Sequence, residues 1–284
     1  MLSYRHAYHA GNHADVLKHL VLVHCLAHLN AKDKPYLVFD THAGAGLYAL
    51  DADASRKTAE YADGIGRLWS RDDLPPAFAE YLRLLRQLNG GGRPHRYPGS
   101  PWFARQLTRE TDTVRLCELH STDFALLRRE FGGDGRRVRV ERADGFEALK
   151  SALPPPSRRG LILIDPSYEV KADYLRLTTV LKDALKRFAT GTYLIWHPVL
   201  PSIEARQLPE KLKKLDAADW LHATLNVRSP SGDGRGMHGS GMFVINPPWT
   251  LAAALAEALP VLADALAQDA GAGWSLRRAD DTQP

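Results

Sequence analysis

The 284-residue sequence contains only two cysteines, Cys25 and Cys117, which is too few for a disulfide framework. Both lie in apolar runs, so we predict buried, reduced thiols and an intracellular protein. No segment is long and uncharged enough to predict a membrane span, and the first residues lack the pattern of a secretory signal. We therefore expect a cytoplasmic protein without a membrane partner.

Charge and composition allow a large core and favour an anionic partner. The chain has 44% hydrophobic residues, and its length exceeds that of a typical single domain. Its net charge of +4 favours polyanionic partners such as nucleic acids, because basic side chains displace counterions from phosphates. This charge alone does not establish nucleic-acid binding.

The central stretch of the sequence is a run of apolar β-formers over 160–164 that stops at Asp165 and Pro166. Because its hydrophobic residues do not alternate with polar ones, it predicts a strand covered on both faces, as in a parallel sheet. Pro166 ends the strand pairing, so we expect Asp165 to project beyond the carboxyl end of the strand. Ligands of open α/β sheets bind at that edge.

Three further predicted strands, over 36–40, 114–118 and 137–142, end at or beside acids, namely Asp40, Glu118 and Asp144. Glycines follow the first and third of these strands (Gly44, Gly46 and Gly145) and allow a tight turn close to a ligand. The full dinucleotide-binding spacing is missing, which argues against a dehydrogenase. A row of acids suits a cationic ligand with a ribose and an adenine, and S-adenosylmethionine is such a ligand. The alternative is that these acids only cap the following helices.

Residues 51–97 have a helical pattern, with helices predicted over 59–69 and 76–88. In a doubly wound nucleotide-binding fold the ribose-binding acid follows the glycine turn by roughly 20 residues, whereas Glu118 lies 72 residues beyond Gly46. The excess matches an insertion. We therefore predict a Rossmann-like α/β domain over 1–50 and 98–284, with a helical subdomain inserted over 51–97.

The C-terminal third predicts the end of the sheet. A fifth strand is expected over 191–197, and an antiparallel pair over 222–227 and 241–246 flanks a glycine-rich loop. A helix is predicted over 251–267, and residues 270–284 are expected to fray. The result is a mostly parallel sheet with an antiparallel last strand.

Histidines are frequent near the N-terminus, at positions 6, 9, 13, 24 and 28, and their spacing invites a metal site. However, no cysteine or carboxylate completes a recognisable ligand set. We therefore expect no metal.

The sequence Asp165-Pro166-Ser167-Tyr168 resembles the Asp-Pro-Pro-Tyr signature of methyltransferases that act on exocyclic amino groups. Longer runs are similar to the RlmJ family of bacterial 23S ribosomal RNA adenine-N6 methyltransferases: residues 1–6, 9–19, 40–46, 160–165, 187–191 and 241–249. The resemblance covers nearly the whole chain. It implies a class I methyltransferase fold and methyl transfer from S-adenosylmethionine to N6 of a single adenine in 23S ribosomal RNA.

The resemblance also implies roles for particular residues. S-adenosylmethionine would be bound by Lys18, His19, His42, Gly44, Ser100, Glu118, Asp144, Gly145 and Asp165. Asp165 would also be the catalytic acceptor, with the Pro166 carbonyl and the Tyr168 ring, while Tyr4 and His6 would belong to the RNA-binding segment. Ser100 could instead cap a helix, and Lys18 could be a lysine whose stem is buried.

Two features depart from a simple assignment. Ser167 replaces the second proline of the signature, which we expect to loosen the turn. Asn246-Pro247-Pro248-Trp249 also fits a looser form of the signature, but it follows the last predicted strand, so we interpret it as structural.

The implied partner is 23S ribosomal RNA, either free of protein or an early precursor, and the enzyme is expected to act as a monomer. Arginines of the insertion and of the loop over 228–238 would add RNA contacts. Two alternatives stay open at this point: a DNA adenine-N6 methyltransferase and a non-catalytic RNA-binding assembly factor.

Overall fold

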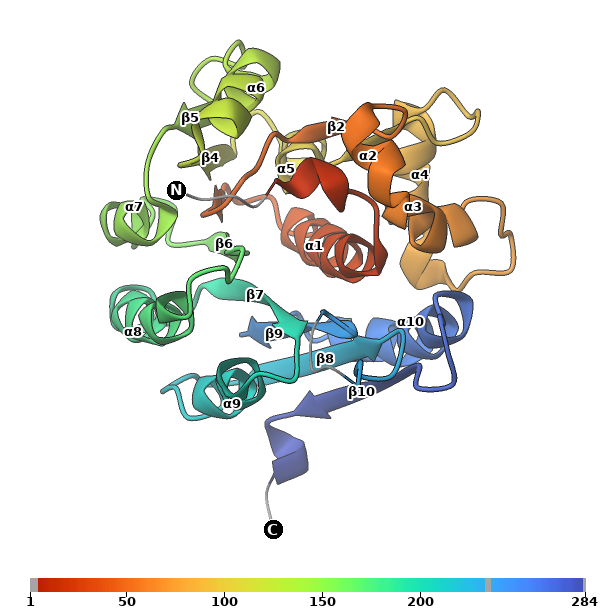
Figure 1. Cartoon of the computed structure of the whole chain (residues 1–284). Helices are drawn as coiled ribbons and strands as arrows, with labels where there is room; N and C mark the ends of the chain where they lie inside the picture. Colours follow the sequence, from red (N-terminus) through yellow and green to blue (C-terminus); the bar gives the residue numbers. More distant parts are fainter. Residues whose placement is uncertain (1–4, 233–235, 283–284) are drawn as a thin grey trace.

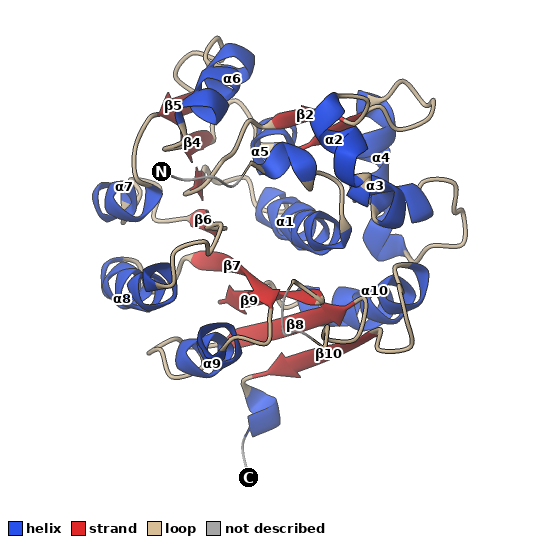
Figure 2. Ribbon diagram, viewed as in Figure 1, coloured by secondary structure: helices blue, strands red, loops and turns tan. Residues whose placement is uncertain are grey.

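The computed structural model describes residues 5–232 and 236–282, and its centre is an eight-stranded sheet (Figure 2). The strands stand in the order β10 (Gly273–Arg278), β8 (Trp220–Asn226), β9 (Gly239–Ile245), β7 (Thr192–Val199), β6 (Gly160–Ile164), β1 (Leu37–Asp40), β4 (Thr113–Cys117) and β5 (Val138–Glu141). The strands from β7 to β5 are parallel, and β9, β8 and β10 continue the sheet antiparallel. This arrangement confirms the Rossmann-like α/β fold.

Strand β6 lies in the middle of the sheet and is buried along its whole length. Leu161 and Leu163 pack into the core on one face, and Ile162 and Ile164 into the core on the other. The unbroken apolar run therefore serves two hydrophobic cores, as predicted.

Helices cover both faces of the sheet (Figure 1). One face carries α7 (Gly145–Ala152), α8 (Ala172–Arg187) and α9 (Ile203–Leu212), and the other carries α1 (His13–Asn30), α5 (Ser100–Leu107) and α10 (Leu251–Ala265). Helix α6 (Ser121–Phe131) packs beside β5. Helix α1 contacts β7 and β9 on its inner side and α4 on its outer side, so most of its residues are buried.

The segment between β1 and α5 is built around a second, two-stranded sheet of β2 (Leu47–Ala49) and β3 (Arg96–Pro98). Its helices are α2 (Asp53–Thr58), α3 (Glu60–Asp63), η2 (Ile65–Arg67), η3 (Pro76–Phe78) and α4 (Ala79–Leu88). The single helix predicted over 59–69 is wrong, because α3 ends at Gly64, whose φ of −106° and ψ of −112° are not helical, and the chain continues as η2. The two-domain division stays a prediction.

Hydrogen bonds attach the N-terminal segment, residues 5–12, to the helical segment between β1 and α5. After η1 (His6–Tyr8), the Gly11 carbonyl accepts a hydrogen bond from the Ile65 amide at 2.9 Å. Ser55 donates its hydroxyl to the Ala7 carbonyl at 3.0 Å. Residues 5–12 are therefore held against the start of α1.

The prediction that residues 270–284 fray is wrong for most of that range. Gly273–Arg278 forms β10, which pairs antiparallel with β8, and η4 (Asp280–Thr282) follows it. The hydroxyls of Thr224 and Ser275 also meet across the two strands at 2.6 Å. Residues 283–284 lie outside the described part of the chain.

The sequence also predicted that the two cysteines are buried and free and that no segment spans a membrane. Cys25 and Cys117 are both buried free thiols, as predicted, and burial raises the pKa of Cys117 to about 12. None of the helices in the described ranges has the length and apolar composition needed to cross a membrane.

Candidate functional site

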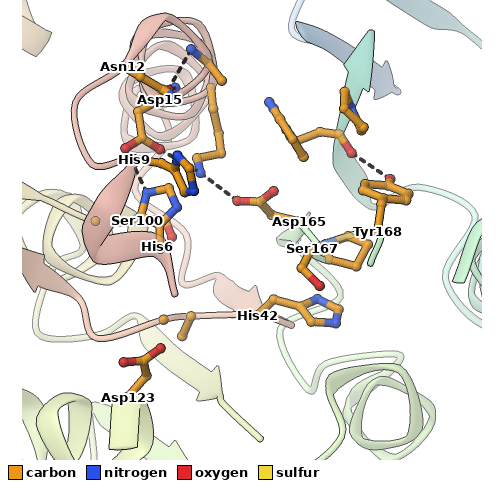
Figure 3. A pocket seen from close by; sticks show the side chains of 18 of the residues that line it. His6, His9, Asn12, Asp15, His42, Ser100, Asp123, Asp165, Ser167 and Tyr168 are labelled. Carbon is orange, nitrogen blue, oxygen red and sulfur yellow. Dashed lines mark hydrogen bonds and ion pairs between the residues drawn. The ribbon is translucent and has the colours of Figure 1, made fainter. Parts of the chain in front are cut away.

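A cavity of about 320 Å³ lies at the carboxyl edge of the parallel strands (Figure 3). Its lining comes mainly from the N-terminal segment, from the starts of α1 and α5, from β7 and from the loops that follow β1, β4, β6 and β7. It includes most of the predicted site residues: His6, Lys18, His19, His42, Gly44, Ser100, Glu118, Asp165, Pro166 and Tyr168. The strand order therefore brings together residues that are up to 162 positions apart in the sequence.

The ammonium group of Lys18 forms ion pairs with two carboxylates in the cavity wall. Its Nζ is 2.6 Å from Asp165 Oδ2 and 2.9 Å from Asp15 Oδ1. Burial lowers the pKa of Lys18, but the two carboxylates outweigh burial and hold it well above its usual range. Lys18 is therefore charged. Its ammonium group is itself buried and paired with carboxylates instead of reaching water, so the interpretation of it as a lysine with only a buried stem is wrong.

Asp15 was not among the site residues predicted from the sequence, although its place in the first turn of a helix could have indicated it. It stands three residues after Asn12, the residue that caps α1, and its Oδ2 accepts the Gly11 amide at 2.9 Å, much as in a capping box. The same oxygen lies 2.8 Å from His6 Nε2. Asp15 thus joins the N-terminal segment to Lys18, which is on the same face of the helix.

The turn after β1 fits a ligand with polar groups. Gly44 has a left-handed φ of 61°, and a Cβ there would lie 2.4 Å from the Tyr48 hydroxyl. Its amide donates to Glu118 Oε2 at 2.8 Å, and the His120 amide donates to Oε1 of the same side chain at 2.6 Å. Glu118 therefore lines the cavity in a fixed orientation, and burial raises its pKa.

Ser100 lines the cavity and forms a buried pair with Asp40, which is not part of the lining. Ser100 Oγ donates to Asp40 Oδ2 at 2.6 Å and makes no capping bond, so the interpretation of Ser100 as a helix cap is wrong. Burial raises the pKa of Asp40 to about 7. His42 lines the cavity as a neutral ring, because burial lowers its pKa to about 4.

The loop after β6 is anchored through Tyr168. This residue has a left-handed φ of 55°, which is strained for a bulky side chain and is typical of functional sites. Its hydroxyl donates to the Trp196 carbonyl at 2.7 Å, and its ring packs 4.6 Å from that of Tyr174. These contacts hold the turn without the second proline, and Ser167 itself lines the cavity (Figure 3).

Two of the predicted residues, Asp144 and Gly145, are not brought into the cavity lining. Asp144 caps α7 and pairs with Arg176 Nη1 at 2.7 Å, which lowers the Asp144 pKa despite burial. A Cβ on Gly145 would lie 1.9 Å from the Thr41 carbonyl oxygen, so close packing already requires glycine there. Tyr4 lies outside the described residues. Their roles toward cofactor and RNA stay predictions.

The second signature-like sequence lies at the opposite edge of the sheet. Strand β9 is antiparallel to β7, with Ile245 beside Tyr193, so Asn246 falls at the amino end of β7. The Asn246 amide donates to the Ala189 and Gly191 carbonyls at 2.7 Å each. It closes a turn far from the cavity, in keeping with a structural role.

The cavity has an unmatched polar atom where a ligand could bind. His19 Nδ1 lies 2.9 Å from the Tyr97 hydroxyl, whereas its buried Nε2 has no hydrogen-bond partner among the described residues. Burial holds the pKa of His19 well below its usual range, so the ring is neutral. Such an atom, in a cavity that Glu118 and the glycine turn also line, fits a cofactor with hydroxyl and amino groups. Within residues 5–232 and 236–282, no group of three or more His, Cys, Asp or Glu side chains is placed to hold a metal ion.

The sheet and the cavity at its carboxyl edge are typical of the Rossmann-like methyltransferase fold. Residues 33–278 match the family model described as "Ribosomal RNA large subunit methyltransferase D, RlmJ". The chain therefore belongs to the RlmJ family.

Individual relatives agree with this assignment. Ribosomal RNA large subunit methyltransferase J of Escherichia coli K12 is 49% identical over 262 residues, covering 92% of this chain and 93% of that protein. The protein of the same name from Haemophilus influenzae is 46% identical over 277 residues, covering 97% and 98%. The crystal structure of protein LPL1258 from Legionella pneumophila superposes with a TM-score of 0.87 at 36% identity, covering 95% of this chain and 98% of that one.

Proposed function

We propose that this protein transfers a methyl group from S-adenosylmethionine to the exocyclic N6 of a single adenine in 23S ribosomal RNA. The observation that carries the proposal is the Asp165 carboxylate, which ends the central strand and is held by Lys18 at 2.6 Å in the wall of the cavity. Relatives that match over nearly the whole chain are named ribosomal RNA large subunit methyltransferases.

The cofactor supplies the methyl group as an electrophilic sulfonium. Glu118, fixed by two backbone amides, would accept the ribose hydroxyls, and the Gly44 turn would lie against the cofactor. His19 would use its unmatched Nε2, and His42, Ser100 and Lys18 would complete the pocket wall. Asp144 and Gly145, which follow β5, are proposed to contact the adenine end.

The adenine amine is a poor nucleophile because its lone pair is delocalised into the ring. Asp165 and the Pro166 carbonyl would accept its two N–H groups and align the lone pair with the methyl group. The ion pair with Lys18 uses Asp165 Oδ2, which leaves Oδ1 for the amine. Asp165 would receive the proton as the N–C bond forms. Tyr168, fixed by its hydroxyl, would present its ring to an unpaired or flipped base.

The RNA would reach the cavity past the N-terminal segment, and Tyr4 and His6 would contact it. His6 lines the cavity and is held by Asp15, so it is placed to contact a base or phosphate there. Arginines of the helical segment 51–97 and of the 228–238 loop would add contacts to the backbone. The substrate would be protein-free or early precursor RNA, and the enzyme would act in the cytoplasm as a monomer.

Replacing Asp165 with Ala should abolish methyl transfer to deproteinised 23S ribosomal RNA while RNA binding persists, because the amine loses its acceptor. Transfer of labelled methyl groups and an RNA gel-shift assay measure the two quantities. Retained turnover would refute the assignment of Asp165.

The two alternatives make different predictions. A DNA adenine-N6 methyltransferase has the same chemistry at Asp165 but would methylate duplex DNA in preference to ribosomal RNA. A non-catalytic assembly factor would bind RNA without measurable affinity for S-adenosylmethionine in a calorimetric titration.

A further inference from the structure

Asp15 is the most deeply buried carboxylate of the cavity wall, with 1% of its surface exposed. Burial raises its pKa, but His6 and Lys18 outweigh burial and keep the pKa well below the usual range. The side chain is therefore a carboxylate at neutral pH. A buried charge is costly unless it is paired and hydrogen-bonded, and the two oxygens of Asp15 have different partners.

Helix capping accounts for only one of the two oxygens. Oδ2 accepts the Gly11 amide at 2.9 Å and meets His6 Nε2 at 2.8 Å, which serves the N-terminal segment and the start of α1. Oδ1 instead lies 2.9 Å from Lys18 Nζ, one turn along the helix. Figure 3 shows Asp15 above His6, with Asp165 directed toward the same helix.

Lys18 reaches Asp165 across the cavity wall from α1, with its Nζ 2.6 Å from Oδ2. A lysine side chain has many rotamers, so a single ion pair would not fix the position of its ammonium group. Asp15 supplies a second ion pair to the ammonium group, at 2.9 Å. The orientation of the Asp165 carboxylate thus depends on a residue 150 positions earlier in the chain.

We propose that Asp15 is a positioning residue for methyl transfer, which holds Lys18 against Asp165 and so fixes the carboxylate that accepts from the target amine. The proposal rests on the function proposed above. Asp15 itself touches neither the amine nor the transferred methyl group. Because the same side chain holds His6, it also ties the orientation of Asp165 to the place of the N-terminal segment.

The test is Asp15→Asn, which keeps the shape of the side chain and removes its charge. Displacing a reacting group by about 1 Å costs on the order of 100-fold, so we expect kcat to fall by about 100-fold, with a smaller change in KM for ribosomal RNA because Asp15 also holds His6. The matched control is Asp112→Asn. Asp112 is also 1% exposed and accepts the Tyr36 and Arg109 amides at 3.0 and 2.8 Å, but it lies at the opposite edge of the sheet. This control should lose stability without losing kcat.

A binding measurement separates positioning from general damage. If Asp15 acts through Lys18 and Asp165, then Asp15→Asn should weaken binding of S-adenosylmethionine, measured by calorimetry, in the wild-type background. In an Asp165→Asn background the same change should alter Kd by less than about twofold, since coupled residues are not additive. Equal effects in both backgrounds would overturn the proposal.

Two outcomes need a second variant or comparison. If Asp15→Asn does not fold, Lys18→Gln breaks the same contact from the other side, and wild-type kcat in a folded Lys18→Gln protein would overturn the proposal. If Asp165→Ala retains turnover, the proposed function fails. If Asp165→Ala is inactive but Asp15→Asn matches Asp112→Asn, only the positioning role fails.

Discussion

Lowering the pH from 7 to 5 should destabilise this fold markedly, and a buried histidine pair gives the size of the effect. His197 on β7 and His222 on β8 face each other across β9, with their Nε2 atoms 2.9 Å apart. They meet because Gly241 on β9 has no side chain, and a Cβ there would lie 2.3 Å from His197 Nε2. Both rings are buried, so one neutral ring donates to the other.

The magnitude follows from the pKa of His197, which burial lowers from 6.5 to about 4. Burial and the neighbouring His197 also hold the pKa of His222 well below its usual range. A histidine with a lower pKa in the folded state is protonated preferentially on unfolding. Its stabilising contribution is complete above pH 6.5 and is lost as the pH falls toward 4. At pH 5 the loss through His197 amounts to about 2 kcal/mol.

The assay is urea denaturation at pH 7 and pH 5, for the wild type and for His197→Gln. His13 and His42, whose pKa values are also lowered to about 4, contribute equally to both proteins. The free energy of unfolding of the variant should therefore fall by about 2 kcal/mol less than that of the wild type between the two pH values. Equal losses in the two proteins would refute this account of the pair.

Two further predictions concern the parts of the fold that frame the site. A Cβ at Gly64 would lie 2.0 Å from the Gly11 carbonyl oxygen, so Gly64→Ala should displace the N-terminal segment. Thermal denaturation should show a loss of about 1–3 kcal/mol in the free energy of unfolding. Gly133→Ala is the control and should leave the stability nearly unchanged, because a Cβ there has open space around it. Removing residues 273–284 would take β10 from the edge of the sheet and expose β8. The truncated protein should unfold at a lower temperature, and light scattering should detect its aggregation through the exposed strand. An unchanged melting temperature would contradict a structural role for β10.

Local patterns in the sequence predicted the framework of the site well. Strand β6 was recognisable because it needs an apolar side chain on both faces, and Asp165 because proline ends the strand directly after it. Glu118 was predicted as a cofactor-binding residue because it ends a predicted strand, and because its distance from the glycine turn is close to the usual spacing plus the length of the insertion. These signals are local, and the parallel sheet then brings the strand ends together.

The contacts between distant segments could not be predicted in the same way. Lys18 meets Asp165 at a separation of 147 residues, and no periodicity in α1 reveals which of its polar residues faces the sheet edge. The helix is buried on nearly all sides, so it lacks the amphipathic pattern that usually orients a helix. Strand β10 was missed because its exposed, arginine-rich sequence has little apolar content, and it is held by pairing with β8.

The most direct test of the proposed function is mass-spectrometric mapping of N6-methyladenine in 23S ribosomal RNA from cells with and without this protein. The proposal predicts that one adenine loses its N6-methyl group when the protein is absent. The wild type should restore the modification, and Asp165→Ala should not. An unchanged methylation map in cells that lack the protein, or restoration by Asp165→Ala, would contradict it.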